Sequence, residues 1–228
     1  GSGTAVYWNP ALLANKKDHG VHFQHNESFE GLLKHDFLSY CGSPYSINQS
    51  SSQSPLSFYI QLNRVPDIPI SDNLDGGESF DVGAIPLIDR YATAGDLVFG
   101  AATAFKIDRW GQHWQEWSLG FALKLIHRNL YDVKGTGFGL DLGLHRKLGN
   151  RAELGIICRD VTSTLLFWDD GQVQQILPEL GIGLAWHQPW EAMLSEVDLE
   201  IDLYSDLAGK TPDFEGKLFL TFSNSATA

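Results

Sequence analysis

The sequence predicts an all-β protein, an antiparallel up-and-down transmembrane β-barrel of which about nine or ten strands are present. Long stretches alternate strictly between apolar residues and small or polar ones, and short turn sequences separate these stretches. No stretch approaches the roughly 18 consecutive apolar residues that a membrane-spanning helix requires, which excludes a helical membrane protein. The mean hydropathy of -0.15 agrees with a membrane barrel, because the two faces of each spanning strand average out.

The clearest strands lie near the middle of the chain. Over residues 118–125, every second residue is apolar, at Leu119, Phe121, Leu123 and Leu125. Residues 137–145 repeat this pattern, with apolar residues at alternate positions from Phe138 to Leu144. Successive side chains of a strand point to opposite faces, so both segments are predicted to be two-faced strands. Further strands are predicted at residues 21–29, 37–41, 56–65, 97–107, 152–160, 180–187, 197–203 and 214–222.

Turn sequences join these strands into a meander. Lys147-Leu-Gly-Asn150 predicts a tight hairpin, and Ala208-Gly-Lys-Thr-Pro212 is predicted to join the last two strands. The stretch from Pro66 to Asp96 has no alternating run and is rich in Pro, Gly and Asp. Because a loop of that length is usually functional, we expect residues 66–96 to form a lid, plug or docking surface at one mouth of the barrel.

The composition of the two strand faces predicts which one lines the lumen. One face is nearly uniform Leu, Ile, Val and Phe, as contact with lipid requires, whereas the other consists of Gly, Ala, Asp, Glu and His. Glycine and small residues suit a crowded, curved lumen. Tryptophans near several strand ends agree with the aromatic girdles of membrane barrels. The residues predicted to face the lumen include Asp141, His145, Asp198, Glu200 and Asp202.

A soluble secreted β-sandwich is the alternative interpretation of the same alternation, because a sheet that covers an apolar core also has a period of two. The chain would then be a binding module or a structural subunit of a larger assembly.

Charge and motifs argue against two further classes of protein. A net charge of -12, with no long run of Lys or Arg, argues against nucleic-acid binding. The sequence has no nucleophile-elbow, metalloprotease or phosphate-loop motif, so we predict neither an enzyme nor a cofactor. Cys41 and Cys158 lack metal or redox spacing, and a disulfide between them stays open.

The long loop holds a weak candidate for a metal site. Its glycine-bent part carries four carboxylates that could bind calcium, from Asp72, Asp75, Glu78 and Asp81. Their spacing departs from that of the calcium-binding loop, and a solvated acidic loop explains them better. We therefore predict no metal site.

Several segments resemble the PorV/PorQ family of outer-membrane proteins, which is related in architecture to the FadL long-chain fatty-acid transporters. A hatch-like motif near the mature N-terminus of that family is matched by Tyr7, Trp8, Asn9, Pro10 and Ala11. A loop of the family, which is an Arg-rich turn, is matched by Arg64, Asp67, Ile68 and Pro69. Residues 118–125 and 137–144 are similar to two strands of the family. Taken together, the resemblance covers most of the chain.

The resemblance implies a single β-barrel domain over residues 4–228, with residues 4–20 folded inside the barrel as a small hatch. Gly1-Ser2-Gly3 reads as the remnant of an expression tag. Family members close with about fourteen strands, within the range known for such barrels. This chain would therefore be shortened, close as a smaller barrel, or need partner strands to cover its edges, because open edges cannot face lipid.

The chemistry of the hatch-like motif predicts a capped helical turn. Asn9 precedes a proline, which disfavours helix at Asn9, and its side-chain amide can cap a turn. Pro10 suits the first position of a helix, and residues 11–14 suit one helical turn. A capped turn without any hatch role is the alternative.

The resemblance also implies a function and a location. The chain would lie in the bacterial outer membrane, with membrane lipid as a partner. It would act in protein secretion or anchoring, with exported proteins or secretion-machinery subunits as partners, or in the passage of small hydrophobic molecules. The residues themselves do not separate these two roles.

Overall fold

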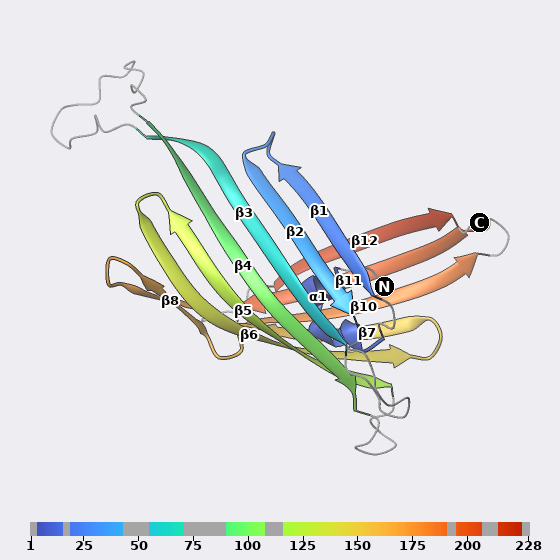
Figure 1. Ribbon diagram of the computed structural model, residues 1–228. Coiled ribbons are helices and arrows are strands. Elements are labelled where there is room, and N and C mark those ends of the chain that lie inside the picture. The colour runs from blue at the N-terminus through green and yellow to red at the C-terminus, as the bar shows by residue number, and fades with distance from the viewer. Residues whose placement is uncertain are drawn as a thin grey trace.

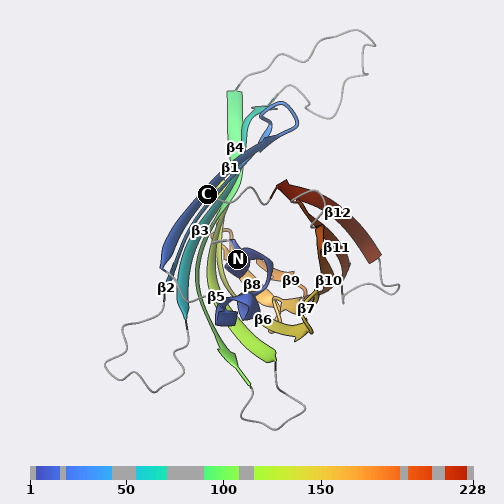
Figure 2. The ribbon, with the colours of Figure 1, turned by 90° about the vertical axis from the view of Figure 1, so that its right-hand side faces the viewer.

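The computed structural model describes residues 4–15, 19–42, 55–70, 90–107, 116–190, 195–206 and 214–224, with side chains up to Trp186. This part of the chain forms one curled antiparallel sheet and two short helical segments (Figure 1). The helical segments are α1 (Ala5–Trp8) and the 3₁₀ helix η1 (Pro10–Asn15). Both lie inside the curl of the sheet (Figure 2).

The sheet consists of a path of ten strands, in which each strand pairs antiparallel with the next, and one attached hairpin. In order along the sheet, the strands of the path are β1 (Gly20–Ser28), β2 (Leu33–Gly42), β3 (Leu56–Ile70), β4 (Arg90–Lys106), β5 (Trp117–Leu130), β6 (Val133–Leu148), β7 (Ala152–Arg159), β10 (Glu179–Trp190), β11 (Ser195–Asp206) and β12 (Phe214–Asn224). The hairpin consists of β8 (Thr164–Trp168) and β9 (Val173–Ile176). This order confirms the predicted all-β, antiparallel meander.

The sheet has the shape of a half-barrel. Figure 2 shows it curling around the helical segments, with β12 across from β1. These two strands end the path, and among the described residues they are not paired with each other.

The two faces of the curled sheet carry different side chains. On the convex face, Leu123 is 64% exposed and Phe138 is 68% exposed. On the concave face, Ala122 is only 2% exposed. The concave face supplies a core of buried residues, among them Phe37 of β2, which belongs to the same buried cluster as Leu13 of η1. Many large apolar side chains of the strands therefore point outwards, while the core lies between the wall and the helical segments.

The predicted loop at 66–96 is wrong at both of its ends. β3 continues to Ile70 and β4 begins at Arg90, and the two strands pair to those residues. The register shifts between Val65 and Ile68, with Asp67 in the left-handed backbone region, as in a β-bulge. β2 pairs with β3 only as far as Arg64, so the prolines at 66 and 69 remove no bond of that ladder. Residues 71–89 lie outside the described part of the chain.

Two turns explain how the middle strands connect. Residues 149–151 join β6 to β7, with Gly149 at a φ of 69°, which confirms the predicted hairpin. After β7, residues 160–163 leave the ladder, with Asp160 and Ser163 in the left-handed backbone region. β8 then pairs with β6 beyond the end of β7. Neither β8 nor β9 was predicted, and the predicted turn at 208–212 lies outside the described residues.

Cys41 and Cys158 are free thiols, so the disulfide left open above is not formed. None of the helices in the described ranges has the length and apolar character needed to cross a membrane.

Candidate functional site

The N-terminal segment forms a compact insert on the concave face, which we call the hatch (residues 5–15). Its helix η1 packs against β4, β5 and β6, and Figure 2 shows it enclosed by the curl of the sheet. Ala11 and Leu13 are almost fully buried there. The motif predicted for a hatch thus lies against the concave face of the sheet.

Asn9 joins the hatch to the wall. Its side-chain Nδ2 donates hydrogen bonds to the backbone oxygens of Leu144 at 3.1 Å and Ile156 at 3.0 Å. Its Oδ1 accepts a hydrogen bond from the backbone N–H of Ala11 at 2.9 Å. Asn9 is buried, and both N–H groups of its side-chain amide and the amide oxygen have hydrogen-bond partners. Asn9 is extended before Pro10, where η1 begins, which confirms the predicted capped turn.

Glycines of the wall make room for the hatch. A Cβ atom at Gly120 would collide with the backbone of Pro10 and Ala11. A Cβ atom at Gly143 would collide with Oδ1 of Asn9. Only glycine permits so close an approach of backbone to backbone. The small residues of the predicted lumen face therefore have a specific role here, which is to receive the hatch.

Aromatic residues complete the seat of the hatch. The ring of Tyr7 packs against Phe37 at 5.6 Å and against Trp8 at 5.0 Å between ring centroids, both edge to face. Trp8 is 47% exposed, so it lies at the margin of the hatch.

A second group of polar residues lies on the same wall, beside the hatch. Lys124 Nζ lies 2.9 Å from Asp141 Oδ1 and 3.0 Å from Asp160 Oδ1. The hydroxyl of Thr164 donates to Asp160, and the backbone N–H of Asp160 donates to Asp141 at 2.8 Å. The side chains of Lys124 and both aspartates are only 12% exposed. Two carboxylates thus share one cation, and Gly139 leaves the space that this ion cluster fills.

The residues predicted to line the lumen are placed only in part. Asp141 belongs to the ion cluster, and His145 is buried with its Nε2 at 3.0 Å from Glu153. The other three residues, which are Asp198, Glu200 and Asp202, lie in β11. The backbone of β11 pairs with that of β10, and its side chains are outside the described part. The sequence did not predict Asp160, because its approach to Lys124 depends on the break after β7.

The family-like loop at Arg64 is not a turn. Its four residues lie in β3, and Nη2 of Arg64 donates to Oδ2 of Asp36 on β2 at 2.9 Å. The bulge turns the backbone at Asp67, while Ile68 and Pro69 continue the ladder with β4. This is a correction of the expected loop, since the prolines at 66 and 69 hid the strand.

The convex face of β1 to β6 carries a continuous apolar row. Six residues that follow one another across the strands in register are all large, apolar and between 39% and 68% exposed: Phe23, Leu38, Ile60, Phe99, Leu125 and Phe138. The neighbouring row is also apolar and consists of Val21, Tyr40, Phe58, Ala101, Leu123 and Leu140. We call these two rows the apolar band.

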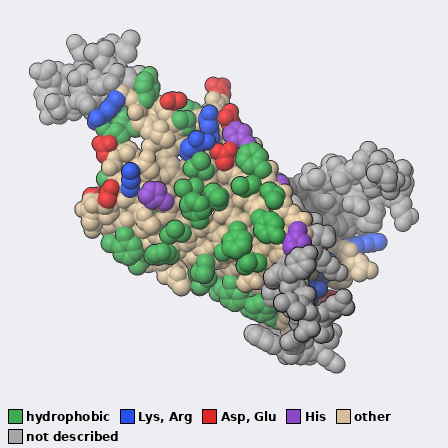
Figure 3. Space-filling model, viewed as in Figure 1, with side chains coloured by type: hydrophobic (Ala, Val, Ile, Leu, Met, Phe, Trp, Pro, Cys, Tyr) green, Lys and Arg blue, Asp and Glu red, His purple; other side chains and the backbone are tan. Residues whose placement is uncertain are grey.

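The apolar band ends along one line. Two rows further on, the same six strands carry Glu27, Lys34, Arg64, Gly95, Asn129 and Lys134. Ion pairs cross this row and the one before it, as between Lys34 and Glu27 at 3.3 Å. Figure 3 shows the same division, with hydrophobic side chains gathered over the middle of this face and charged ones towards its upper end.

Within the described ranges, no three His, Cys, Asp or Glu residues are arranged to hold a metal ion. The carboxylates at 72, 75, 78 and 81 lie outside those ranges.

Compared with known proteins, the chain matches no protein-family model and no curated protein.

Proposed function

We propose that this chain is an outer-membrane barrel protein of PorV/PorQ type, with its convex face in lipid and its concave face closed by the hatch. It acts in protein secretion or anchoring, or in the passage of small hydrophobic molecules. The observation that carries the proposal is the apolar band, in which large side chains of six adjacent strands stand exposed together. Soluble monomeric proteins seldom expose so wide a contiguous apolar surface.

The arrangement of polar groups supports the same proposal. On β1 to β6, the charged side chains lie on the concave face, as those of the ion cluster do, or past one or the other end of the apolar band. A membrane barrel has this distribution, with a polar interior and an apolar belt bounded by polar side chains. Lipid also requires that the edges of β1 and β12 be paired, with each other or with strands of a partner.

The proposal can be tested by the chemistry of cysteines placed on β5. In a background where Cys41 and Cys158 are replaced by Ser, Leu123→Cys lies in the apolar band and His127→Cys lies beyond it on the same face. A thiol in hydrocarbon does not ionise and reacts poorly with a water-soluble maleimide. We expect labelling of His127→Cys in native membranes, but not of Leu123→Cys. Equal labelling of the two would refute the membrane location, because both positions are exposed in the free chain.

Purification separates the two roles and the soluble alternative. A stoichiometric protein partner that co-purifies in mild detergent would support secretion or anchoring, whereas bound acyl chains would support passage. The unpaired edges of the half-barrel favour one further candidate, a soluble subunit whose sheet is completed by an assembly partner. A monodisperse chain at high concentration in plain buffer would favour that candidate.

A further inference from the structure

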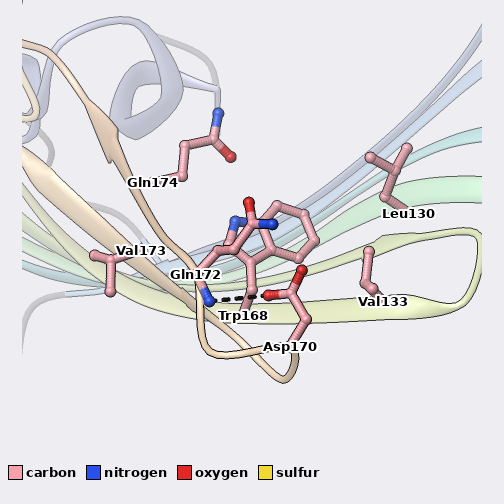
Figure 4. A pocket seen from close by; sticks show the side chains of 7 residues that line it. All are labelled: Leu130, Val133, Trp168, Asp170, Gln172, Val173 and Gln174. Atoms are coloured by element: carbon pink, nitrogen blue, oxygen red, sulfur yellow. Dashed lines mark hydrogen bonds between the residues drawn. The ribbon is translucent and has the colours of Figure 1, made fainter.

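A cavity of about 380 Å³ lies at the rim of the concave face, between the β5–β6 turn and the β8–β9 hairpin (Figure 4). Leu130 and Val133 line one side of it, and Trp168 and Gln174 line the other. The hatch packs at Gly120, near the opposite end of β5, so this rim pocket is separate from the hatch site.

Trp168 is held as a flat platform in the rim pocket. It pairs in register with Gly135 of β6, and a Cβ atom at Gly135 would lie 3.1–3.3 Å from three atoms of the indole ring. The ring therefore lies against bare backbone, and a side chain at Gly135 would require the ring to shift by a few tenths of an ångström. Trp168 also lines the cavity.

The hairpin that carries Trp168 is fixed by its own hydrogen bonds. The backbone N–H of Trp168 donates to the oxygen of Gln172 at 2.9 Å, and the N–H of Gln172 donates to Asp170 Oδ1 at 2.9 Å (Figure 4). Asp169 and Lys134 tie the hairpin to β6, since each N–H donates to an oxygen of the other residue. A pocket built in advance loses less entropy when a ligand binds.

We propose that the rim pocket binds a neutral saccharide. A sugar ring has an apolar C–H face, which stacks on an aromatic ring, and a rim of hydroxyl groups that both donate and accept hydrogen bonds. The amides of Gln172 and Gln174 and the carboxylate of Asp170 offer matching donors and acceptors. The cavity is in the size range of small-ligand sites.

Other ligand classes fit the lining less well. The described residues that line the rim pocket include no Lys or Arg, and Asp170 would repel an anion. A hydrocarbon would cover the apolar part of the lining, which includes Val173, but it would form no hydrogen bond with the exposed side chains of Asp170, Gln172 and Gln174. The saccharide inference does not depend on the location of the chain in a membrane.

The test is calorimetric titration of the full-length chain with a panel of neutral oligosaccharides built from glucose, galactose and mannose. The chain is kept in a zwitterionic detergent, because detergents with sugar headgroups would themselves occupy the pocket. We expect saturable binding of at least one of these sugars, weakened by about tenfold in Gln174→Ala through the loss of hydrogen bonds. Trp168→Ala should weaken it further, and Trp168→Phe, which keeps an aromatic ring on Gly135, should weaken it less.

The matched control is Gln175→Ala, on the same strand and next to Gln174, whose side chain is exposed and does not line the cavity. Its affinity should equal that of the unchanged chain. The proposal is overturned if no neutral sugar binds, or if Gln174→Ala and Gln175→Ala bind equally well.

Discussion

Oδ1 of Asn9 occupies the place where a side chain at Gly143 would begin. The same Asn9 side chain bonds to backbone oxygens on β6 and β7, so the hatch is fixed at the point where the wall has no side chain. Position 143 and position 9 are therefore coupled, although one belongs to the wall and the other to the insert.

The first prediction follows from this coupling. Gly143→Ala should lower the free energy of unfolding by about 1–3 kcal/mol, because the added methyl group displaces Asn9 from a filled space. Denaturant unfolding in detergent micelles measures the loss. Gly20→Ala is the control, since nothing lies within 4 Å of the Cβ position at Gly20. In an Asn9→Ala background the cost of Gly143→Ala should shrink; strictly additive costs would show that the two residues do not interact.

A second prediction concerns the apolar band. Leu123→Arg in the band, and Leu142→Arg in the next row of the same face, should each impair membrane assembly by roughly 2–4 kcal/mol if the convex face lies in lipid. In a soluble protein, arginine at the exposed position 123 would change stability by only about 0.5 kcal/mol or less. Reversible folding into lipid vesicles provides the measurement, with His127→Arg on the same face as control. If Leu142→Arg and Asp141→Arg are tolerated equally, the assignment of the two faces is wrong.

A third prediction concerns the ion cluster. Lys124→Met should destabilise the fold by about 3 kcal/mol, because Asp141 and Asp160 would be left close together without their cation. Thermal unfolding monitored by circular dichroism checks this. Lys147→Met is the comparison, since Lys147 is half exposed and its contact with Glu153 at 3.8 Å should contribute less than about 1 kcal/mol. Replacing Lys124 and Asp160 together by Met and Asn should restore part of the stability. A loss at Lys124 no larger than that at Lys147 would show that the cluster does not stabilise the wall.

The sequence predicted the strands whose two faces differ most in polarity. At 118–125 and 137–145 the alternation of large and small residues set both the period and the outward face. The ends of β3 and β4 were missed because residues 90–96 mix small and polar residues, and because prolines at 66 and 69 are usually signs of a loop. Pairing on one side only, together with a bulge, made the strand possible there.

The candidate site was predictable in its local part only. Asn9 and Pro10 predicted a capped turn, since capping depends on neighbouring residues. Lys124 and Asp141 were visible as charges on the inward face of adjacent strands, and their register is a signal that could have paired them. Asp160 and Trp168 could not be placed, because both depend on where the chain leaves and rejoins the ladder of β6.

The bonds of Asn9 also imply an order of assembly. Their acceptors lie 135 and 147 residues further along the chain, on strands that must already be paired. A chain that emerges from its amino end therefore exposes the hatch sequence long before its seat exists, and closing so long a loop is slow. The wall should form first and the insert should dock last, so amide hydrogen exchange at Ala11 should become protected after that of β6 during refolding. Protection of Ala11 before β6 would reverse this order.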